Sequence, residues 1–149
     1  ALKWEITCDL GMVASSLAEL DAAVQASSKI EVTGMLLAEA RWFEPRVLGV
    51  CVFHRTWAGN VFLDFLAAHP DVGRSDPRIS GVGVGLLYRL CEVTLHLQAG
   101  LLWGETTVGS ASYYRRFFHL EEESDRLVVT PAQQEAFCRS VRERQERQT

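Results

Sequence analysis

The stretch Arg78-Ile-Ser-Gly-Val-Gly-Val-Gly-Leu-Leu-Tyr-Arg-Leu90 decides how the rest of the chain is interpreted. Three glycines alternate with valines and then give way to a leucine-rich run. A glycine-rich turn that leads into a helix exposes backbone N–H groups that the helix does not use, at the positive end of its dipole. Such a turn can bind a phosphate group. The alternative is that the glycines only permit a tight turn or close packing of the helix on a sheet.

The segment after the glycines predicts an amphipathic helix. Apolar residues recur at helical spacing between Leu86 and Leu97, whereas Arg89, Glu92 and His96 fall on the opposite face. Gly100 stands where the end of this helix is expected. Because His96 and Glu92 are four residues apart, we expect them to pair on the surface.

Hydrophobic periodicity and turn residues predict the other elements. A hairpin is expected because two β-rich runs flank the turn-forming segment Phe43-Glu-Pro-Arg46. Thr130-Pro-Ala-Gln133 has the residues of a helix start with a capping box. The expected order is a strand at 4–8, a helix at 11–27, strands at 32–41, 47–56 and 61–68, the glycine turn and its helix, a strand at 101–105, a short helix at 110–118, a strand at 126–129 and a last helix whose polar end, 142–147, is expected to fray.

This order predicts an α/β fold with a mixed sheet and helices on its faces. The hairpin excludes a purely parallel, doubly wound sheet. The 149 residues favour a single domain over the whole length, 1–149, and contain no linker long enough to divide it. A chain of this size can bury a core without disulfides or a structural metal.

Composition narrows the classes of function. The net charge of −4 argues against a nucleic-acid partner and is compatible with a cationic or amine substrate. The four cysteines, at 8, 51, 91 and 138, form no CxxC motif and are expected to be buried, reduced thiols. No residues have metal-ligand spacing, so no metal is expected. Without an apolar stretch approaching 18 residues or a signal segment, we expect no membrane partner and a cytoplasmic location.

Two segments together resemble the signature of the GCN5-related N-acetyltransferase (GNAT) superfamily. In that family a strand ending in an Ala-Val-His-Pro-like sequence leads to Arg/Gln-x-x-Gly-x-Gly/Ala. Here Leu63-Asp-Phe-Leu-Ala-Ala-His-Pro70 leads to Arg78-x-x-Gly81-x-Gly83, which matches every fixed position. Downstream, Ser110-Ala-Ser-Tyr-Tyr-Arg-Arg-Phe-Phe118 is similar to the family's late Ala…Tyr-x-Lys…Phe segment. The resemblance covers roughly residues 61–120.

The resemblance implies a GNAT-like acyltransferase fold with a central, mostly antiparallel sheet flanked by helices, and acetyl-CoA or another acyl-CoA as co-substrate. In the family the strand before the turn splays from the next one, usually at a bulge, and the pantetheine arm pairs with its exposed edge. The pyrophosphate lies on the glycine turn, where the amides from Val82 to Gly85 would be the donors. The implied cofactor-binding residues are Leu66, Ala67, Ala68, Arg78, Gly81, Val82, Gly83, Val84 and Gly85.

Acyl transfer to an amine needs an acid for the departing thiolate and a base for the amine. The resemblance makes Tyr114 the candidate acid, because it matches the family's tyrosine near the thioester sulfur. Tyr113 takes that place if the register of the match is wrong by one residue. The alternative is that Tyr114 only packs in an aromatic cluster.

Asp64 is the candidate base because it is a polar residue inside the apolar run Phe-Leu-Asp-Phe-Leu. A carboxylate there is costly unless it is paired or faces a wet cleft. Strand alternation places it on the face of Phe62 and Leu66. An ion pair with an arginine is the alternative, and Glu39, Glu105 or a water chain could serve as base instead.

Three functions therefore remain open at this stage. The first is an N-acetyltransferase whose acceptor is a small-molecule amine or a peptide, with homodimer formation left open. The second is a non-catalytic acyl-CoA-binding sensor or interaction module of the same fold. The third is a dinucleotide-binding protein with Glu105 as the ribose-binding acid, although the third glycine is wrongly spaced for GxGxxG and a long loop separates the strand from the turn.

Overall fold

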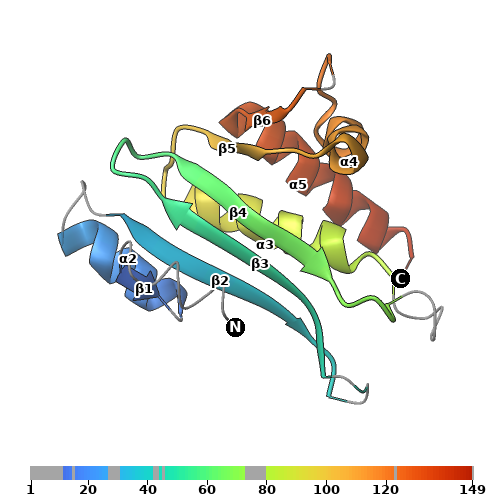
Figure 1. Cartoon of the computed structure of the whole chain (residues 1–149), viewed down its shortest axis with the longest axis horizontal. Helices are drawn as coiled ribbons and strands as arrows, with labels where there is room; N and C mark the ends of the chain where they lie inside the picture. Colours follow the sequence, from blue (N-terminus) through green and yellow to red (C-terminus); the bar gives the residue numbers. More distant parts are fainter. Residues whose placement is uncertain are drawn as a thin grey trace.

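The computed structural model describes residues 12–14, 16–26, 31–41, 44, 46–72, 80–122 and 124–148. These residues contain one six-stranded sheet in which the strands follow their order in the sequence (Figure 1). The strands are β1 (Met12–Ala14), β2 (Val32–Glu39), β3 (Val47–Arg55), β4 (Val61–Ala68), β5 (Leu102–Glu105) and β6 (Arg126–Val129).

Three of the strand pairings are antiparallel and two are parallel. β2, β3 and β4 form an antiparallel meander, and β5 pairs antiparallel with β6. β1 pairs with β2 in parallel, and β4 pairs with β5 in parallel. The β4–β5 pair is parallel because the helix α3 (Val82–His96) crosses over between the two strands. The expected mixed, mostly antiparallel sheet of an α/β fold is confirmed.

The helices bury one side of the sheet. α3 and α5 (Pro131–Glu146) lie behind the sheet in Figure 1, and α4 (Val108–Phe118) packs against α5 and β6. α2 (Leu17–Ala26) contacts β1 and β2. Large side chains that these elements bury completely or almost completely include Phe53, Leu87, Leu90, Leu102, Phe118, Leu127 and Phe137.

The prediction for the N-terminal region was partly wrong. Met12–Ala14 is a strand, and the helix expected at 11–27 begins only at Leu17. The helix begins there because the Ser16 hydroxyl accepts a hydrogen bond from the backbone N–H of Glu19 at 3.2 Å. This bond caps the first turn. The strand expected at 4–8 lies outside the described residues, as do Phe43 and Pro45 of the hairpin turn.

The helix after the glycine turn begins earlier than expected. Gly81 has φ of 74°, the left-handed conformation that glycine adopts without strain, and α3 starts at the next residue. The helix ends at His96 rather than near Gly100, and Gln98 takes the positive φ of 52°. The expected pair of His96 with Glu92 is wrong: His96 bonds to Asp21 of α2, and Glu92 bonds to Arg89.

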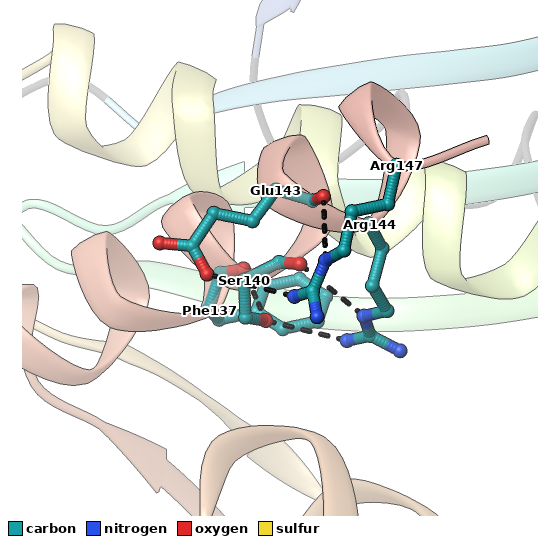
Figure 2. A network of polar contacts seen from close by, with 5 residues as sticks. All are labelled: Phe137, Ser140, Glu143, Arg144 and Arg147. Carbon is teal, nitrogen blue, oxygen red and sulfur yellow. Dashed lines mark hydrogen bonds and ion pairs between the residues drawn. The ribbon is translucent and has the colours of Figure 1, made fainter. Parts of the chain in front are cut away.

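The C-terminal helix agrees with the sequence at its start and exceeds the prediction at its end. The capping box is confirmed, since the N–H of Thr130 donates to the Gln133 side chain and the N–H of Gln133 to the Thr130 hydroxyl. The polar end is helical through Glu146. Figure 2 shows why: Arg144 donates to the Ser140 carbonyl and Arg147 to the Glu143 carbonyl, both at 3.2 Å.

The bulge in β4 determines the shape of the site. Phe53 pairs with Leu63 and Val52 with Phe65, so Asp64 is an extra residue in β4. Beyond it the faces change: Leu66 pairs with Cys51 and shares the helix-covered face of Leu63. The expectation that Asp64 and Leu66 share the face of Phe62 is therefore wrong for Leu66.

Gly34 gives the packing of the sheet a direct test. A Cβ on this residue would lie 2.4 Å from Cζ of the buried Phe53 ring. We expect Gly34→Ala to destabilise the fold by about 1–3 kcal/mol, because the ring must move within a packed core. Gly109→Ala in α4 is the matched control, since nothing lies within 4 Å of its Cβ position. Denaturant midpoints measure both, and an unchanged midpoint for Gly34→Ala would contradict this packing.

Two further expectations from the sequence concern the cysteines and membrane-spanning helices. Cys51, Cys91 and Cys138 are free and buried, as expected, and Cys8 lies outside the described residues. Among the helices that the structure describes, none combines the length and the apolar character needed to cross a membrane.

Candidate functional site

β4 and β5 separate from each other in the middle of β4. Their pairing runs from Val61–Leu102 to Leu63–Gly104 and stops one residue before the bulge at Asp64. In Figure 1 the two strands diverge beyond this point, β4 toward the glycine turn and β5 toward α4. Within the described chain, the end of β4 thus has a strand partner only on its β3 side. The splay at a bulge is the geometry that the resemblance to GNAT implied.

The open edge of β4 carries backbone groups that can pair with a ligand. On the β3 side of β4, the N–H of His69 donates to the carbonyl of Leu48. The carbonyl of Ala67 faces Gly49 of the same strand, β3. Since backbone groups alternate along a strand, those of Leu66 and Ala68 face the open edge. An extended ligand can add to this edge as an extra strand would.

A cavity of about 540 Å³ lies in the splay, within the range usual for ligand sites. It is formed by the end of β4, the glycine turn, the first turn of α3 and one side of α4. The predicted residues Leu66, Ala67, Ala68, Gly81, Val82, Gly83, Val84 and Tyr114 all line it, together with Val72, Ser80, Ser110 and Tyr113. Segments up to 48 positions apart, from Leu66 to Tyr114, thus meet at one place.

The amides at the start of α3 are anion donors by their position. Val82, Gly83 and Val84 occupy the first helical turn, where N–H groups have no partner within the helix, at the positive end of the dipole. Gly85 differs, because its N–H donates to the Gly81 carbonyl at 2.8 Å and it does not line the cavity. The expectation that Gly85 donates to the ligand is therefore wrong. Arg78 lies outside the described residues.

The two neighbouring tyrosines of α4 reach different parts of the cavity. The hydroxyl of Tyr113 lies over the glycine turn, 2.7 Å from where a Cβ of Gly83 would stand. Tyr114 is only 8 % exposed and belongs to the core cluster that contains Cys51. Burial, and then the neighbouring Tyr113 and Cys51, raise the pKa of Tyr114 to about 12. Its phenol is therefore protonated at neutral pH and available as a donor.

The carboxylate of Asp64, the candidate base, is paired with a histidine. One carboxylate oxygen lies 2.8 Å from Nδ1 of His54, and the two side chains are 21 % and 26 % exposed. His54, which sequence analysis did not single out, is half-buried on the face of the sheet opposite α3. Its signal was the hairpin register, which places His54 opposite Phe62 and next to Asp64.

The alternative bases lie elsewhere. Glu39 is at the far end of β2 and pairs with Arg46 at 3.6 Å, both side chains being exposed. Glu105 ends β5 opposite Arg126, is exposed, and is not among the residues that line the cavity. Among the described residues, no three histidine, cysteine or acidic side chains are grouped so that they could hold a metal ion.

Comparison with known proteins adds two structural likenesses. No protein-family model matches the chain, and no curated protein sequence matches it. The crystal structure of nourseothricin acetyltransferase is similar at 22 % identity and a TM-score of 0.46, over 56 % of this chain and 48 % of that one. An acetyltransferase from Bacillus cereus ATCC 14579 is similar at 14 % identity and a TM-score of 0.48, over 69 % of this chain and 77 % of that one.

The chain thus spans about half the length of the first of these structures. Both are acetyltransferases by name, the activity that the sequence resemblance implied. At these identities and TM-scores we draw no functional argument from the likeness, and the function is argued from the site itself.

Proposed function

We propose that this protein is an acyltransferase that moves an acetyl or other acyl group from acyl-CoA directly to an amine. The observation that carries the proposal is the convergence of three features on one cavity: the edge of β4 that has no strand partner among the described residues, the first-turn amides of α3, and the protonated Tyr114. Each of these serves a different part of an acyl-CoA molecule.

The pyrophosphate is bound by the amides of Val82, Gly83 and Val84. The absence of a Cβ at Gly83 lets it approach the backbone closely. The pantetheine arm lies along β4 and pairs with the backbone of Leu66 and Ala68. We expect this path to bring the thioester to the point where β4 and β5 part, in the cavity that Tyr114 lines.

The transfer itself needs no covalent enzyme intermediate. The amine lone pair attacks the thioester carbon, and the tetrahedral intermediate collapses as the C–S bond breaks. Backbone N–H groups of the open β4 edge can donate to the carbonyl oxygen. The hydroxyl of Tyr114 donates to the sulfur as negative charge develops there.

The charge of the protein suits a basic acceptor. The net charge of −4 and the Asp64 carboxylate at the splay favour an ammonium group over an anion. Small-molecule amines and peptide amines are both of this kind.

Amine-dependent release of CoA tests the proposal. The full chain is incubated with acetyl-CoA and a panel of primary amines, including amino acids, peptides, polyamines and aromatic amines, and free thiol is measured. We expect at least one amine to raise release above hydrolysis and to gain the mass of an acetyl group. Binding of acetyl-CoA without acetylation of any amine would instead identify a non-catalytic acyl-CoA-binding module.

A further inference from the structure

The His54–Asp64 pair stands at the point where the sheet opens. Asp64 is the bulged residue, one position after the last β4–β5 pair and two before Leu66, which lines the cavity. Two residues of strand span about 7 Å. The pair therefore lies where the open edge of β4 begins, beside the cavity that Leu66 and Tyr114 line.

The imidazole ring of His54 is held in one orientation. Its Nδ1 is bonded to Asp64 at 2.8 Å. The ring packs on Phe62 with the centroids 5.2 Å apart, and Trp103 packs edge-on against Phe62 at 4.6 Å. Because an ionised carboxylate only accepts hydrogen bonds, Nδ1 carries the proton and the lone pair of the neutral ring is on Nε2.

The surroundings make this ring more basic. The hydrogen bond to Asp64 raises the pKa of His54 above its ordinary value of 6.5, burial opposes the rise, and the charges of Asp64 on β4 and Glu31 beside β2 add to it. An imidazole of this kind can accept a proton near neutral pH.

We propose that His54 is the catalytic base, which takes a proton from the amine acceptor through Nε2, and that Asp64 is a positioning residue that orients the ring. The inference rests on the acyltransferase function proposed above. It replaces the assignment of Asp64 itself as base and leaves the role of Tyr114 unchanged.

The protons balance in this scheme. An ammonium acceptor loses two protons when it becomes an amide. One passes to Nε2 of His54 and from there to solvent. The other ends on the CoA sulfur, which the Tyr114 hydroxyl stabilises by a hydrogen bond, so that CoA leaves as a thiol. The C–N bond forms and the C–S bond breaks without any further reactant.

The aromatic neighbours favour the same acceptor. Phe62 and Trp103 lie beside the pair, and Trp103 is 36 % exposed. An ammonium group is attracted to aromatic faces as well as to the Asp64 carboxylate. Both features favour an ammonium acceptor that approaches from this side of the sheet.

Two substitutions separate the roles. His54→Gln removes the base, so we expect kcat/KM to fall by about 10²–10⁴-fold and the acidic limb of its pH profile to disappear. Asp64→Asn keeps a hydrogen-bond acceptor for Nδ1 but removes the charge that raises the pKa of His54. We expect this variant to keep a pH dependence whose midpoint is moved to lower pH, with a smaller loss of rate.

His96 and Asp21 supply a matched control. They form a histidine–carboxylate pair of the same 2.8 Å length on the surface between α3 and α2, outside the cavity. His96→Gln and Asp21→Asn should leave the rate and its pH profile unchanged. Added imidazole should restore part of the activity of a His54→Gly variant, which a purely structural role would not allow.

The outcomes distinguish the inference from the function on which it rests. If the parent acetylates an amine and His54→Gln does so equally well, the inference is wrong. It is also wrong if Asp64→Asn abolishes activity at every pH while His54→Gln retains it, since the carboxylate would then be the base. If the parent acetylates no amine at all, the acyltransferase function itself fails. NMR titration of His54 should show its pKa falling in Asp64→Asn, and an unchanged pKa would contradict the coupling.

Discussion

Replacing Tyr114 by phenylalanine should lower turnover by about 10²–10⁴-fold, the usual effect of losing a general acid. The change keeps the buried ring of this cavity-lining residue and removes only its hydroxyl. A phenol whose pKa is raised to about 12 is a weaker acid than a thiol, so its main contribution is a hydrogen bond to the charge that develops on sulfur. We therefore expect a large loss in kcat, little change in the affinity for CoA and little change in Tm.

The other two tyrosines of the chain are the controls for this result. Tyr88 is on α3 and does not line the cavity, so Tyr88→Phe should have parental turnover. Tyr113→Phe should have an intermediate effect, because its hydroxyl lies over the glycine turn. A larger loss from Tyr113→Phe than from Tyr114→Phe would assign the acid to Tyr113. If all three variants have parental activity, water rather than a tyrosine protonates the departing thiolate.

Gly83→Val should weaken the binding of CoA by about 10²-fold or more. A side chain at Gly83 would stand where the pyrophosphate approaches the first turn of α3. The loss of one or two charge-assisted hydrogen bonds, about 1.5–3 kcal/mol each, gives this magnitude. Calorimetric titration of the folded variant with CoA measures the change.

The local packing demands a control, because a Cβ at Gly83 would also lie 2.7 Å from the Tyr113 hydroxyl. In the double variant Gly83→Val with Tyr113→Phe, that collision is relieved while the ligand remains obstructed. We expect binding to stay weak. Full recovery in the double variant would attribute the loss to the displaced tyrosine. Gly109→Val, the same change in the first turn of α4, should bind CoA as the parent does.

The sequence was sufficient for the features that depend on local pattern. The strand at 61–68 and the capping box at Thr130 follow from alternation and from capping residues, and both are as expected. The glycine turn was correctly identified as the point where a helix begins, although α3 starts at Val82 and thereby removes the Gly85 amide from the free donors. Whether the Gly85 amide is free depends on which residue begins the first helical turn, and the glycine content of the segment does not determine that residue.

The features that the sequence did not predict depend on pairing between strands. The bulge at Asp64 changes which side chains share a face, and it follows from the register of β3 against β4 rather than from either strand alone. The His54–Asp64 pair has the same origin. The pairing of Arg55 with Val61 places His54 opposite Phe62, so the signal was present in the sequence but depended on knowing this register.

The measurement that tests the central claim most directly is a calorimetric titration of the intact chain with acetyl-CoA, alongside an identical titration with NAD. The account predicts saturable binding of acetyl-CoA at one site per chain, with no binding of NAD over the same concentration range. Binding of NAD without binding of acetyl-CoA would contradict it, since the glycine turn would then hold a dinucleotide rather than the pyrophosphate of an acyl donor.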